Sequence, residues 1–121
     1  MAVTVTQLGP GTLRKIRDAD TSATLEANVA TGAATLHSAF IDNTLNTSAV
    51  YVKLYNATTA TVGTTVPFLV IPVPASKSLP VNFLGGGLPF SVAISFAGVT
   101  TGGTGGVTSP VSDVIVELVV R

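Results

Sequence analysis

The side chains best suited to acid–base or nucleophilic chemistry are His37 and Ser38, because the chain of 121 residues has one histidine and no cysteine. They are adjacent in a segment that alternates like a β-strand, so their side chains point to opposite faces and cannot pair as base and nucleophile. A small sandwich hydrolase, the alternative enzyme hypothesis, would need acidic or histidine side chains converging in a cleft. We therefore expect no enzyme, and we interpret His37 as a half-buried strand residue.

Two pairs of carboxylates have spacings that could suggest chemistry. Asp113 and Glu117 share one face of an expected strand but lie about 13 Å apart by the usual strand rise, farther than the carboxylates of a glycosidase. Carboxylates from other strands are still able to approach them. Asp18 and Asp20 form an Asp-x-Asp pair, but the glycine and closing glutamate of a calcium loop are missing. We expect exposed charges at both places, and neither a metal nor a cofactor.

The composition excludes several classes of partner. Charged residues make up 10% of the chain, against about 25% in an ordinary domain, so clustered positive charge for nucleic acid is lacking. The longest apolar stretch, residues 66–75, is interrupted by prolines and is shorter than the roughly 20 residues of a membrane span. The N-terminus lacks the pattern of a signal peptide. A neutral, threonine-rich surface loses its water at low cost, so we expect part of it to be buried in an assembly.

The elements that must position these residues are β-strands. Apolar and polar residues alternate with a period of two, and turn residues separate the alternating runs. The pattern predicts strands at residues 34–41, 49–55, 67–73, 78–83, 88–97 and 112–120. In the fifth of these, Phe90, Val92, Ile94 and Phe96 are expected to share the core face. Short strands without a long helix predict an all-β fold, an antiparallel β-sandwich or jelly-roll-like single domain.

The first 30 residues differ from the remainder of the chain. They hold a dense group of charges that includes Arg14, Lys15 and Arg17, and they alternate only loosely. We interpret residues 1–30 as an N-terminal arm, in which residues 3–6 could add a short edge strand to the body or to a neighbour. Residues 31–121 are expected to form the β-sandwich domain. The basic residues of the arm are candidate interface residues.

Two further groups of residues are candidates for an interface. Tyr51, Lys53 and Tyr55 form an outward stripe on their strand, and tyrosine is enriched at interfaces because it buries a large rigid area and keeps a polar group. The arm could equally cover this stripe. Small residues share the outward face of a later strand, and they permit close approach of another backbone or form a solvated face: Ser91, Ala93 and Ser95.

The second half of the chain resembles small structural proteins of tailed-bacteriophage virions, of the capsid decoration or cement type. The residues that carry the resemblance are, in order, 41–44, Asn46, 50–56, 61–67, 69–75, Phe83, 87–90 and 113–116. The match covers residues 34–121 through the order and spacing of several strands, and no single motif is diagnostic. The first 30 residues carry no pattern of this kind.

The resemblance implies a non-enzymatic β-sandwich that binds the outer capsid and stabilises contacts between major capsid subunits. It further implies the major capsid protein and sister copies as partners, a homotrimer at local three-fold positions, and synthesis in the host cytoplasm. Neither nucleic acid nor membrane is expected as a partner.

A tail, baseplate or fibre module that takes part in host attachment is the alternative. Such a receptor binder should display aromatic or polar loop tips. Residues 56–65 and 98–110 are instead rich in threonine, glycine and alanine and contain no aromatic residue. This composition favours the capsid decoration hypothesis.

Overall fold

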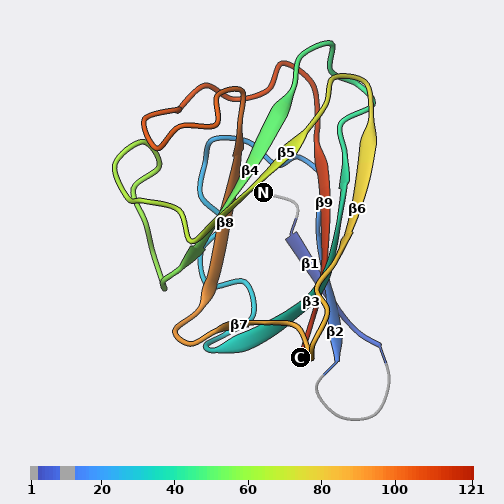
Figure 1. Cartoon of the computed structure of the whole chain (residues 1–121), viewed down its shortest axis with the longest axis vertical. Coiled ribbons are helices and arrows are strands. Elements are labelled where there is room, and N and C mark those ends of the chain that lie inside the picture. Colours follow the sequence, from blue (N-terminus) through green and yellow to red (C-terminus); the bar gives the residue numbers. More distant parts are fainter. Residues whose placement is uncertain (1–2, 9–12) are drawn as a thin grey trace.

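The computed structural model describes residues 3–8 and 13–121, which fold into two antiparallel β-sheets that pack face to face (Figure 1). The larger sheet, called the large sheet below, has the order β1 (Val3–Gln7), β2 (Arg14–Asp18), β9 (Ile115–Val120), β3 (Ala34–Asp42) and β6 (Ser78–Asn82), and β7 (Leu88–Phe90) also pairs with β3. The small sheet has the order β5 (Leu69–Val73), β4 (Val50–Asn56) and β8 (Ile94–Val99). The predicted antiparallel β-sandwich is confirmed. Over the described ranges, no helix is long and apolar enough to cross a membrane.

The core lies between the sheets and is built from the alternating strands. Val50, Val52 and Leu54 of β4 are fully buried, as the alternation predicted. Across the core, β9 places Val116 and Leu118 inward in the same way. These β-branched and aliphatic side chains suit a pleated, half-buried strand, so pattern and packing agree.

The strand predicted at residues 88–97 is two strands in two different sheets. β7 belongs to the large sheet and β8 to the small sheet, and the chain turns between them. The Asn56 side chain holds this corner, because its Oδ1 accepts a hydrogen bond from the Val92 N–H at 2.9 Å and its Nδ2 donates to Ser91 Oγ at 3.1 Å. Val92 is therefore 50% exposed, and its predicted place on the core face is wrong.

Residues 14–18 are also placed differently from the prediction. They form β2, which pairs with both β1 and β9 inside the large sheet. Ile16 is fully buried in the core. This segment is an integral strand and not an arm, because its pairing partner, β9, lies about 100 residues later in the chain and local pattern does not reveal it. Strand β1 forms one edge of the sheet.

Residues 19–32, called the crossing segment below, carry the chain from the large sheet to the small sheet and back. The segment runs antiparallel along β8, and Glu26 and Phe96 exchange backbone hydrogen bonds of 2.8 and 3.0 Å. Gly98 N–H donates to the Ser22 carbonyl at 2.8 Å. The crossing segment therefore covers the β8 edge and closes one side of the sandwich.

Candidate functional site

The stripe of Tyr51, Lys53 and Tyr55 lies on the outer face of the small sheet, but it is not exposed. Lys53 is 0% and Tyr55 1% exposed, and Tyr51 is half-buried. The cover is the chain's own glycine-rich loop, residues 98–110: a Cβ on Gly102 would lie 2.8 Å from Cδ1 of Tyr51. The prediction of a free binding stripe is wrong for Lys53, because glycines let the loop lie directly on the sheet, and it is wrong for Tyr55, which is also buried.

Lys53 holds the glycine-rich loop in place. Its ammonium group donates hydrogen bonds to the carbonyl oxygens of Gly103, Thr104 and Gly106 at 2.7, 3.3 and 3.0 Å. Three acceptors match the three donors of an ammonium group. Burial lowers the pKa of Lys53, and within the described residues no carboxylate forms an ion pair with it. Lys53 is therefore a structural clamp and is not accessible to a partner.

The small-residue face is also mostly covered. Ser91 is exposed, whereas Ala93 and Ser95 are 0% exposed. Ser95 Oγ donates to the Ala57 carbonyl at 2.7 Å and accepts from the Asn28 N–H at 2.9 Å. The small side chains do permit close approach of a backbone, as predicted, but the backbone belongs to the same chain. The proposal of Ala93 and Ser95 as interface residues is wrong.

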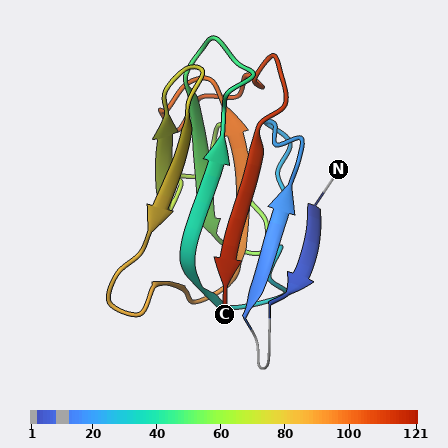
Figure 2. The same cartoon turned by 90° about the vertical axis from the view of Figure 1, so that its right-hand side faces the viewer.

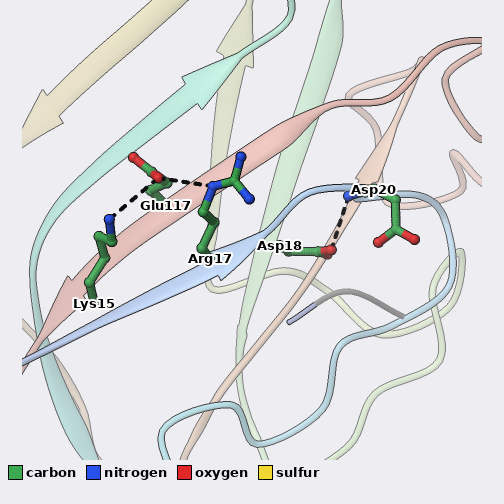
Figure 3. A network of polar contacts seen from close by, with 5 residues as sticks. All are labelled: Lys15, Arg17, Asp18, Asp20 and Glu117. Atoms are coloured by element: carbon green, nitrogen blue, oxygen red, sulfur yellow. Dashed lines mark hydrogen bonds and ion pairs between the residues drawn. The ribbon is translucent and has the colours of Figure 1, made fainter. Parts of the chain in front are cut away.

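All three basic candidates are partly exposed. Lys15 Nζ and Arg17 Nε lie 3.7 and 3.2 Å from the same Glu117 oxygen, Oε2 (Figure 3). The pairing follows from register, because Arg17 of β2 lies directly opposite Glu117 of β9. Arg14 instead donates to the Ala30 carbonyl at 3.1 Å. Lys15 and Arg17 therefore stand on the outer face of the large sheet with Glu117 between them.

In the part of the chain that the structure describes, no loop covers this outer face as the glycine-rich loop covers the small sheet. Figure 2 shows the large sheet face-on, with β6, β3, β9, β2 and β1 side by side. Phe40, which is 38% exposed, lies between Pro80 and Glu117 in the register. We call the following set the open face: Lys15, Arg17, Ser38, Phe40, Pro80, Ile115, Glu117 and Val119. Partly exposed apolar groups mixed with compensated charges are typical of a protein–protein interface.

A cluster of carboxyl groups was missed by the sequence analysis. Oxygen atoms of Asp18, Asp20 and Glu26 all lie within 4.8 Å of one another, and Asp18 and Glu26 are 0% and 7% exposed. Asp18 Oδ2 accepts a hydrogen bond from Thr21 Oγ1 at 2.9 Å, and its Oδ1 accepts one from the Asp20 N–H at 3.2 Å (Figure 3). The sequence showed the Asp-x-Asp pair, but Glu26 joins it only because the crossing segment folds back.

Burial and proximity change the acidity of this cluster. Burial, together with a hydrogen bond to Asp18 and the charge of that group, raises the pKa of Glu26 to about 7. Burial also raises the pKa of Asp18. Two adjacent buried carboxyl groups cannot both ionise without a large cost, so they share a proton at neutral pH. The cluster could offer three oxygen ligands to a cation, fewer than the six to eight that calcium takes.

Two further polar residues, His37 and Asn46, lie inside the fold. His37 lies at a bulge in β3, and its buried Nε2 has no hydrogen-bond partner among residues 3–8 and 13–121. Asn46 is 4% exposed, and its Nδ2 donates to Asn43 Oδ1 and to the Ser112 carbonyl, each at 3.0 Å. A pocket of about 50 Å³ lies beside Asn46, far smaller than a ligand site. Its lining residues are Asn46, Thr47, Ser48, Val50, Thr100, Pro110 and Val111.

The described residues thus form an accessible surface of interface character, the open face, and a buried carboxyl cluster. Comparison with known proteins finds no matching family model, curated protein or solved structure.

Proposed function

We propose that this protein is a non-enzymatic structural protein of a bacteriophage virion, which binds the outer capsid and stabilises contacts between major capsid subunits. The observation that supports the proposal is the difference between the two sheets. The chain covers the outer face of the small sheet with its own loops, whereas the described residues leave the open face of the large sheet partly exposed to solvent. A surface that combines Phe40 with charged residues is suited to a protein partner.

The charges of the open face argue for a protein partner and against nucleic acid. Lys15 and Arg17 both lie beside Glu117, so the patch has little net positive charge. Binding to phosphates depends on uncompensated Lys and Arg side chains that displace counterions. A patch of compensated charges instead gives orientation and specificity to a contact between proteins.

The construction of the domain is also suited to a passive structural role. Lys53 fixes the glycine-rich loop and the crossing segment closes the side of the sandwich, so the surface is presented by a supported, jelly-roll-like body. Many copies on one particle would turn individually weak contacts into a strong combined effect. No chemical step is required for such a function.

The test is sedimentation of the purified protein with capsid shells assembled from the major capsid protein of the same virus. We expect the wild-type protein to sediment with the shells and Phe40→Asp to lose binding, because the substitution places a charge in the centre of the open face. Val111→Asp is the matched control, since Val111 is 98% exposed and outside that face. Failure of the folded wild-type protein to bind the shells would refute the proposal.

One observation favours the alternative, a tail, baseplate or fibre module. Leu84 and Val111 are 90% and 98% exposed in loops of the sandwich, where a tip could contact a host receptor. In that case Val111→Asp, and not Phe40→Asp, would abolish binding, and the target would be the host cell surface. Binding of the labelled protein to host cells distinguishes the two functions.

A further inference from the structure

The two sheets have four edges, and three of them carry a device that prevents pairing with another chain. Unprotected edge strands present backbone groups that can pair with foreign strands, and proline, charge or a covering segment blocks this. β5 contains Pro72, and β6 contains Pro80. The β8 edge is covered by the crossing segment through backbone hydrogen bonds. These features protect one edge of the large sheet and both edges of the small sheet.

Within residues 3–8 and 13–121, none of these three devices is found along residues 4–6 of the fourth edge, β1. Its sequence, Val-Thr-Val-Thr-Gln, contains neither proline nor a charged residue. Residues 4–7 of β1 are exposed. Val5 lies opposite Ile16 on the core-facing side of the sheet, and its side chain is nevertheless 51% exposed. Valine and threonine are among the residues most suited to a strand. β1 is therefore a strand whose central residues, Thr4 to Thr6, are not covered by any other described segment, and its Val5 side chain remains half exposed.

We propose that β1 pairs antiparallel with β1 of a second copy around a two-fold axis, so that two large sheets form one continuous sheet. A two-fold contact must be self-complementary, because the same residues meet from both sides. Pairing centred on Val5 places Val5 opposite Val5 and Thr4 opposite Thr6, and such β-branched cross-strand pairs are favourable. The contact also buries the exposed Val5 side chain.

The charges near this edge permit the contact. The nearest cations on the outer face, Lys15 and Arg17, belong to β2, so those of the two copies are separated by three strand spacings, about 14 Å. This exceeds the screening length of about 8 Å at physiological ionic strength. Each cation also lies beside Glu117 of its own chain. Like-charge repulsion across the two-fold axis is therefore weak.

The inference does not depend on the proposed function, and it differs from the homotrimer implied by the resemblance. A strand edge that pairs with itself closes after two copies, whereas a trimer needs two different surfaces at each contact. In the resulting dimer, the open faces of both copies lie on the same continuous sheet. The occupant of the edge is thus a second copy of this chain, and the dimer presents two open faces together.

The first test is the solution mass by light scattering over a wide range of protein concentration. We expect a mass that approaches twice the 12.2 kDa of one chain. Val5→Lys should raise the dissociation constant at least about tenfold, because two lysines would meet at the axis. Ser78→Lys should leave the dissociation constant unchanged, because Ser78 is an exposed residue of β6, the edge strand that contains Pro80. A monomer at every concentration, or a trimer that is insensitive to Val5→Lys, would overturn the proposal.

The second test uses the absence of cysteine from the sequence. Directly opposite residues of an antiparallel pair have Cα atoms about 4.5 to 5.5 Å apart, within the range of a disulfide. Val5→Cys should therefore form a covalent dimer on mild oxidation. Thr4→Cys should form it far more slowly, since Thr4 would meet Thr6 and not itself. Equal cross-linking of the two variants would contradict the register. If neither variant formed a covalent dimer, the edge would not be occupied by a second copy, as expected if a segment of another protein binds there, and the proposal would be wrong.

Discussion

Substitution of Glu26 by glutamine should make the protein more stable above neutral pH and leave it nearly unchanged in acid. In the folded chain Glu26 is 7% exposed and shares a proton with Asp18. The unfolded chain titrates at the ordinary pKa of 4.5, whereas the folded chain holds the Glu26 proton up to a pKa of about 7. Between these values the folded state binds more protons, so its stability falls as pH rises.

The size of the effect follows from the same pKa values. A rise in the pKa of Glu26 from 4.5 to about 7 corresponds to about 3 kcal/mol, since a tenfold change in acidity is worth about 1.4 kcal/mol. Glutamine has the shape of the protonated side chain and stays neutral at every pH. The variant should therefore be more stable than the wild type by up to about 3 kcal/mol at pH 8 and nearly equal to it near pH 4.5.

The assay is urea unfolding of both proteins at several pH values between about 4.5 and 8, with a chelator present so that no cation replaces the proton. Asp113→Asn is the matched control, because it removes one exposed carboxylate outside the cluster. The control should follow the wild-type curve. If the curves of wild type and Glu26→Gln run parallel over the whole range, the two carboxyl groups do not share a proton and the reasoning is wrong.

Four further substitutions, of which one is a control, test the packing of the glycine-rich loop and of Asn46. Lys53→Met should lower the free energy of unfolding by about 2 kcal/mol, because three loop carbonyls lose their hydrogen bonds to a charged donor. It should also increase amide exchange in the glycine-rich loop. Gly106→Ala should cost about 1 to 3 kcal/mol in thermal unfolding, because a Cβ there would collide with the Thr101 carbonyl. Gly103→Ala is the control: the space around its Cβ is open, so it should cost less than Gly106→Ala or Lys53→Met. Asn46→Ala should cost about 2 to 4 kcal/mol, measured by urea unfolding. A neutral result would show that the hydrogen bonds of this buried amide to Asn43 and Ser112 do not stabilise the fold.

The strands were predictable where the local pattern and the tertiary packing agree. Alternation gave the inward faces of β4 and β9 correctly, because side chains of a strand alternate whatever lies around it. The same alternation gave the outward direction of Lys53 but not its burial. Exposure of an outward residue depends on which distant loop lies over it, and the glycine-rich loop begins about 45 residues later in the chain.

The candidate site was less predictable, because it depends on contacts between distant segments. The corner at Ser91 continues the period-two pattern by chance, so the change of sheet between β7 and β8 left no local signal. Glu26 carries no motif that links it to Asp18, and their contact exists only after the crossing segment pairs with β8. A single glutamate in a loosely alternating segment, with acids six and eight residues earlier, was the available hint.

The position of β9 in the large sheet has a consequence for synthesis of the chain. β2 and β3 both pair with β9. The large sheet therefore cannot form completely until residue 120 has left the ribosome. Loop closure over such sequence distances makes folding slow. The pair of β1 and β2 joins the remainder of the large sheet through β9. A nascent or truncated chain would hence lack a firmly placed β1 edge, and incorporation into an assembly would be restricted to chains whose translation reached β9.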